Sequence, residues 1–131
     1  MTLALLLLAQ APADAPQWNC DEPIAQQELN YCAHQDYLAA DADLNAQWGI
    51  TSAEMKERDK GGWGEEDGRP GYFETLLEGQ RAWLKYRDAQ CTSEGYWARG
   101  GSMEHMLRSY CLARLTKLRT AELRELVEID G

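Results

Sequence analysis

A run of apolar residues at helical spacing, ending in a cysteine, constrains this chain more than any other feature. From residue 72 the apolar side chains recur every three or four positions, as on one face of an α-helix: Phe73, Leu76, Leu77, Trp83 and Leu84. Arg87 lies at the edge of this face. An unpaired guanidinium in a dry site is costly, so Arg87 needs a carboxylate or carbonyl partner. We therefore predict a helix over residues 72–91 that packs on other helices and leads into Cys91.

Two further stretches have the same period. The first covers residues 21–49, and Gly49 is its predicted C-cap. The other begins at Ser102, a favourable N-cap, and has Glu104 in its first turn. Leu and Ala far outnumber Ile and Val, which favours helices over strands. The predicted fold is all-α, a small bundle of three long helices with irregular connectors.

The segment between the first two long helices is charged and then rich in glycine. Thr51 with Glu54 three positions later has the form of a capping box, which predicts a short separate helix. Residues 61–71 contain five glycines and a proline, which predicts a loop. Trp63 lies within this loop and has no periodic neighbours. It either folds back onto the helices or contacts a partner.

The N-terminus resembles a secretory signal. Residues 1–9 are mostly apolar and are followed by small residues and proline, although no Lys or Arg precedes the run. The run is shorter than the roughly 20 residues that span a bilayer, so no membrane span is predicted. We expect residues 1–15 to be a leader and residues 20–128 to be one helical domain. The expected location is periplasmic or secreted.

The four cysteines fit an exported protein. Three pairings are possible, and the sequence alone does not choose among them. The spacings of 12 and 20 residues favour Cys20–Cys32 and Cys91–Cys111, because each bond would then join a connector to a helix. No cysteines or histidines cluster at the close spacing of metal ligands. We therefore predict disulfides that staple the bundle, and no metal or other cofactor.

The net charge of −9 limits the classes of partner. Nucleic acid and anionic membrane surfaces would repel such a chain, so a cationic protein is the natural complement.

No residue pattern indicates catalysis. His34 and His105 have no neighbouring nucleophile that would suggest a catalytic role. Hydrolysis by paired carboxylates has many weak candidates, namely Glu28, Asp36, Asp41 and Glu65. The chain is therefore not expected to be an enzyme.

A set of residues in a particular order resembles the LprI-type lysozyme-inhibitor domain. They cover roughly residues 20–126 and comprise Cys20, Gln26-Gln27-Glu28-Leu29-Asn30, Cys32-Ala33, Tyr37, Ala40-Asp41, Leu44-Asn45, Gln80-Arg81-Ala82-Trp83, Arg87-Asp88, Cys91, Gly100-Gly101-Ser102, Cys111, Leu115-Thr116, Arg119 and Leu123. The resemblance implies a small, helical, exported bacterial domain, sometimes attached to lipid and named for inhibition of lysozyme. This chain departs from it by lacking a lipid-attachment box before Cys20 and by its glycine-rich insert at residues 61–71.

Several polar residues of this pattern lie beside apolar helix faces. They are expected to form a hydrogen-bond network between helices, and a ligand site between helices is the alternative: Asn30, Asp41, Asn45, Arg87 and Asp88. Within this set we predict that Arg87 pairs with Asp41 and that Trp83 packs at the same interface.

Two functions are compatible with these observations. The first is inhibition of a basic lysozyme by occupation of its cleft, through aromatic and acidic residues of the connectors: Trp63, Glu65, Glu66 and Asp67, joined by Tyr96 and Trp97. The alternative is a non-catalytic structural or assembly adaptor in the bacterial cell envelope.

Overall fold

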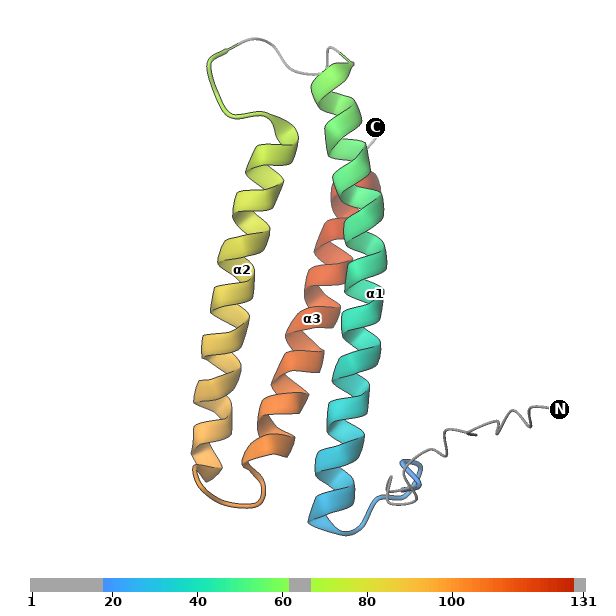
Figure 1. The fold of residues 1–131 in the computed structure, drawn as a ribbon, viewed down its shortest axis with the longest axis vertical. Helices are drawn as coiled ribbons and strands as arrows, with labels where there is room; N and C mark the ends of the chain where they lie inside the picture. Colours follow the sequence, from blue (N-terminus) through green and yellow to red (C-terminus); the bar gives the residue numbers. More distant parts are fainter. Residues whose placement is uncertain (1–17, 62–66, 129–131) are drawn as a thin grey trace, which may run out of the picture.

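Three long helices that run alternately up, down and up make up the molecule (Figure 1). The computed structural model describes residues 18–61 and 67–128. Helix α1 spans Gln26–Lys60, α2 spans Tyr72–Gly95 and α3 spans Glu104–Glu128, with the short 3-10 helix η1, Tyr96–Ala98, between α2 and α3. The described residues contain no strand. The predicted all-α bundle is thus confirmed.

Helix α1 continues without a break through Gly49, so the predicted C-cap and the separate helix at Thr51 are both wrong. A glycine inside a helix costs about 1 kcal/mol relative to alanine. The flanking turns more than compensate, because Leu44 and Met55 are both buried in the same core cluster. Thr51 caps nothing, because it is fully buried inside α1, where it faces α3.

The bounds of the other two helices differ less from prediction. Helix α2 begins at Tyr72 as predicted but continues beyond Cys91 to Gly95. A Cβ at Gly95 would lie 3.2 Å from the Glu104 carbonyl oxygen, so glycine permits the close approach of α2 to α3. Helix α3 begins at Glu104, two residues after the predicted N-cap at Ser102.

The start of α2 is capped from the end of α1. Asp59 Oδ1 accepts a hydrogen bond of 2.8 Å from the Tyr72 backbone N–H, and Asp59 Oδ2 accepts one of 3.2 Å from that of Phe73. These two N–H groups have no partner within the helix, so a carboxylate at this place satisfies them. Asp59 thereby connects the two ends of the glycine-rich segment.

The core has two parts. One part joins all three long helices and consists of Leu44, Met55, Leu76 and Leu123. Four half-buried aromatic residues pack against it: Trp48, Tyr72, Phe73 and Trp83. The other contains Cys91, Cys111 and Leu112.

Both predicted disulfides, Cys20–Cys32 and Cys91–Cys111, are confirmed. The first ties the segment before α1 to that helix, and the second joins α2 to α3 near the connector between them.

Across the described ranges, no helix is both long enough and apolar enough to cross a membrane.

Candidate functional site

The connector between α2 and α3 exposes two aromatic side chains. The Trp97 side chain is 81% exposed and that of Tyr96 is 46% exposed, although both belong to the short helix η1. The Cys91–Cys111 disulfide, whose two residues are fully buried, lies shortly before the connector and fixes the end of α2 against α3. The aromatic rings therefore project from a position that the covalent structure holds in place.

Hydrogen bonds hold nearly every turn of this connector. The Arg99 N–H donates to the Tyr96 carbonyl at 3.1 Å, and the Gly101 N–H donates to the Ala98 carbonyl at 2.8 Å. Gly100 has φ of +78°, a conformation that other residues adopt at a cost, and its N–H donates to Glu104 Oε1 at 3.0 Å.

Helix α1 supports the connector as well. Asn30 Nδ2 donates to the Ser102 carbonyl at 2.9 Å. The connector is therefore ordered before any partner arrives, which lowers the entropy cost of binding.

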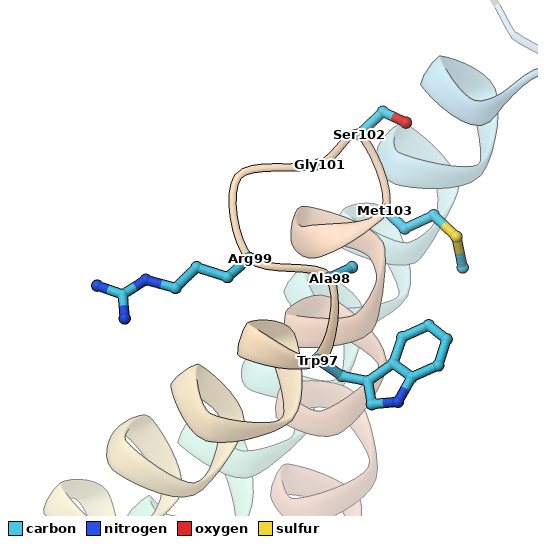
Figure 2. A pocket seen from close by; sticks show the side chains of 6 residues that line it. All are labelled: Trp97, Ala98, Arg99, Gly101, Ser102 and Met103. Atoms are coloured by element: carbon cyan, nitrogen blue, oxygen red, sulfur yellow. The ribbon is translucent and has the colours of Figure 1, made fainter.

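A shallow, open depression of about 390 Å³ lies against the connector. Six residues line it: Trp97, Ala98, Arg99, Gly101, Ser102 and Met103. In Figure 2 the side chains of Trp97 and Met103 project to the same side of the connector, whereas that of Arg99 projects to the opposite side. The Arg99 guanidinium carbon lies 4.2 Å from the centre of the Tyr96 ring, a cation–π contact.

Of the predicted contact residues in the glycine-rich segment, the structure describes only Asp67. Trp63, Glu65 and Glu66 fall outside the described residues. Asp67 is exposed, accepts a 3.0 Å hydrogen bond from the Arg69 N–H and forms an ion pair with its guanidinium. These contacts with Arg69 lower the pKa of the Asp67 carboxyl.

The segment before α2, which includes Asp67, and the connector after α2, which includes the aromatic pair, lie at opposite ends of that helix (Figure 1). Asp67 precedes α2, whereas Tyr96 and Trp97 follow it. Helix α2 has 24 residues, which corresponds to a length of about 36 Å at roughly 1.5 Å per residue. Asp67 therefore does not form one contact surface with Tyr96 and Trp97.

Arg87 occupies the interface at which it was expected. Its guanidinium is buried, lies 3.9 Å from Asp41 and 3.0 Å from Asp88, and donates to Thr116 Oγ1 at 3.4 Å. The predicted pair with Asp41 is present, but the shorter ion pair is with the neighbouring Asp88.

Two aromatic rings enclose the same guanidinium. Its carbon lies 5.1 Å from the centre of the Trp83 ring and 5.5 Å from that of Tyr37. Packing of Trp83 at this interface is therefore confirmed. The role of Tyr37 was not predicted, although its place in the apolar stripe of α1 could have indicated it.

Another residue of the expected polar network, Asn30, lies apart from Arg87. Asn30 is 11 positions from Asp41 along α1, a separation of about 16 Å, and it contacts Ser102 and Gln26. Asn45 is exposed. The structure thus divides the expected network into a cluster at Arg87 and a separate contact at the connector.

The two histidines considered as catalytic candidates, His34 and His105, lie at the surface. Within residues 18–61 and 67–128, no group of three or more His, Cys, Asp and Glu side chains could hold a metal ion.

One carboxyl group near the connector has a perturbed pKa. Glu94 accepts hydrogen bonds from Gln90 at 3.1 Å and from Arg114 at 2.8 Å, and both contacts lower its pKa. The contact with Arg114 links α2 to α3, because Glu94 lies in α2 and Arg114 in α3.

Comparison with known proteins identifies the family of this domain. The family model described as lysozyme inhibitor LprI matches residues 20–123, a range that contains all four cysteines and the whole α2–α3 connector. An uncharacterized protein of Rhizobium meliloti (strain 1021) is 50% identical over 128 residues, covering 96% of this chain and 92% of that protein. No solved structure matches the chain significantly.

Proposed function

This chain belongs to the LprI lysozyme-inhibitor family, and from that premise we propose that it inhibits a basic lysozyme by placing its α2–α3 connector in the enzyme's cleft. The observation that carries the proposal is the 81% exposure of Trp97 on a connector fixed by hydrogen bonds and a disulfide. A large aromatic residue that is exposed yet ordered contributes strongly to binding, because it buries much apolar area at little cost in entropy.

The net charge of the chain also supports binding to a basic lysozyme. The chain carries −9, and a basic enzyme would be attracted to it over distances longer than any contact. Such attraction mainly raises the association rate. Salt should therefore weaken binding, because the screening length falls from about 14 Å at 0.05 M to several Å at 0.5 M.

The proposed action involves no catalysis by this chain, and the domain would work outside the cytoplasm. Export fits the two disulfides, since such bonds persist in oxidising compartments.

The glycine-rich segment remains a competing contact surface. Trp63, Glu65, Glu66 and Asp67 combine an aromatic residue with acids, the residue types suited to a basic, sugar-binding groove. Because α2 separates Asp67 from Trp97 by about 36 Å, we expect one cleft to take only one of the two surfaces. We favour the connector, since its side chains are held in position before binding.

Two single substitutions distinguish these surfaces. Titrate the oxidised protein into hen-type and goose-type lysozymes at low salt, and follow both lysis of cell walls and heat of binding. We expect Trp97→Ala to weaken inhibition at least ten-fold, and Trp63→Ala to leave it nearly unchanged. Tyr86→Ala is the matched control, because Tyr86 is a 56% exposed aromatic residue on α2 that belongs to neither surface.

The opposite pattern, a loss with Trp63→Ala alone, would assign the contact to the glycine-rich segment. Absence of both inhibition and heat with either lysozyme would refute the proposal and favour the adaptor role in the envelope.

A further inference from the structure

The connector carries an exposed positive charge, Arg99, on a protein with a net charge of −9. The Arg99 guanidinium carbon lies over the Tyr96 ring, 4.2 Å from its centre. Among the described residues it forms no ion pair, in contrast to Arg69, Arg87 and Arg114, each of which lies near a carboxylate. Its position over the ring restricts the guanidinium without neutralising its charge.

A lysozyme offers a local counterpart to such a charge. The enzyme as a whole is basic, yet glycoside hydrolysis requires a pair of carboxyl groups in the sugar-binding cleft, about 5 Å apart in retaining enzymes. A guanidinium has five N–H donors in a planar fork that matches carboxylate oxygens. It can therefore contact both members of such a pair.

Resting on the function proposed above, we propose that the Arg99 guanidinium binds the catalytic carboxylate pair of the lysozyme, while Trp97 occupies the adjoining sugar groove. The two side chains leave the connector in opposite directions (Figure 2). A connector that enters an elongated groove would thus extend one side chain along the groove each way. The net negative charge attracts the basic enzyme from a distance, and the contact of Arg99 with the carboxylate pair then determines the position at which the protein binds.

If Arg99 binds the carboxylate pair, its removal should lower the affinity for lysozyme, whereas the accompanying change in net charge should raise it. Removing Arg99 changes the net charge from −9 to −10, which would strengthen long-range attraction to a basic enzyme. A loss of affinity on Arg99→Ala must therefore come from a local contact. Arg124→Ala is the matched control, because Arg124 is also exposed but lies near the C-terminal end of α3, whereas the connector leads into its N-terminal end.

The test is a double-mutant cycle between this protein and a hen-type lysozyme. The variants are Arg99→Ala, Arg99→Lys and Arg124→Ala, each measured against the wild-type enzyme and an enzyme whose catalytic general acid is replaced by the corresponding amide. We expect Arg99→Ala to weaken binding at least ten-fold at pH 7, Arg99→Lys to weaken it less, and Arg124→Ala to have no such effect. The amide enzyme should bind the Arg99→Ala variant almost as tightly as it binds the wild-type inhibitor.

The pH dependence gives an independent readout. The general acid of such an enzyme has a pKa of about 6. The advantage of wild type over Arg99→Ala should therefore be larger at pH 7, where that group is ionised, than at pH 5.

The outcomes separate this inference from the function on which it rests. If the wild-type protein inhibits but Arg99→Ala behaves like Arg124→Ala, lysozyme inhibition stands and the role of Arg99 is refuted. Equal losses for Arg99→Ala against both enzymes would also refute it, because the carboxylate would then not be its partner. If the wild-type protein does not bind lysozyme, both proposals fail.

Discussion

The Thr51 hydroxyl of α1 donates a 2.8 Å hydrogen bond to the backbone carbonyl of Leu123 in α3. Both residues are fully buried, and the same hydroxyl accepts a 3.1 Å hydrogen bond from Gln47 Nε2. A polar side chain in a dry interface is tolerated only when its hydrogen bonds are made. Thr51 therefore fixes the register of α1 on α3 just beyond Gly49, where the sequence suggested that the helix would end.

Thr51→Val should destabilise the protein by about 1–3 kcal/mol, because the isosteric side chain leaves the buried amide of Gln47 without its acceptor. The free energy of unfolding is measured by urea denaturation of the oxidised protein. Thr75→Val, at an exposed position of α2, is the control and should change it by less than about 0.5 kcal/mol. A neutral result at Thr51 would mean that packing alone holds the two helices in register.

Arg87→Ala should cost about 2–4 kcal/mol, because it removes a buried guanidinium from between two aromatic rings as well as an ion pair. The partner carboxylate of Asp88 is 56% exposed, so the loss should stay below that for a fully buried pair. Arg87→Lys retains the charge without the planar group and should lose about 1 kcal/mol. Denaturant melts of both variants beside Arg81→Ala, an exposed arginine of α2, measure the difference. A loss below about 1 kcal/mol for Arg87→Ala would contradict a structural role.

Asp59→Ala should destabilise the protein by about 1 kcal/mol, because it leaves the Tyr72 and Phe73 N–H groups at the start of α2 without their acceptor. Amide hydrogen exchange should become faster in the first turn of α2 and remain unchanged near Cys91. Asp43→Ala, an exposed acid in the middle of α1, changes the net charge equally and serves as the control. Unchanged exchange at Tyr72 and Phe73 would argue against the cap.

The two disulfides should differ in their response to reductant. Cys91 and Cys111 are fully buried, whereas Cys20 is exposed. Limited treatment with a thiol should therefore open Cys20–Cys32 first, which peptide mapping after alkylation would detect. Replacing both Cys91 and Cys111 by alanine should cost about 3 kcal/mol. Earlier opening of Cys91–Cys111 would indicate that α2 and α3 separate readily at the connector.

The sequence predicted those features that depend on local spacing. The helical period located α2 at Tyr72, and the order of the cysteines favoured the pairing that is observed. Arg87 at the edge of an apolar face required a partner, and the structure places it beside Asp41 and Asp88. The prediction that the first helix ends at Gly49 was wrong, because it rested on local propensity alone. Burial of Leu44 and Met55 against the other helices favours a helix that continues through this point.

The candidate site was predicted only in part. An aromatic pair in a connector is visible in the sequence, and its exposure on an ordered turn is not. The hypothesis that Tyr96 and Trp97 join Asp67 in one surface required them to lie near each other in space, and nothing in local spacing measures that distance.

By itself the sequence determined that this chain forms helices and favoured the observed disulfides, since helical period and cysteine spacing are properties of residues that lie close together in the chain. Only the tertiary structure decided which ends of the helices meet, because that depends on helix lengths and on contacts between distant residues. The unbroken α2 separates Asp67, which precedes its first turn, from Trp97, which follows its last turn. The contact between α1 and α3, fixed at Thr51 and Leu123, carries α1 past the glycine at which its local sequence would have ended it.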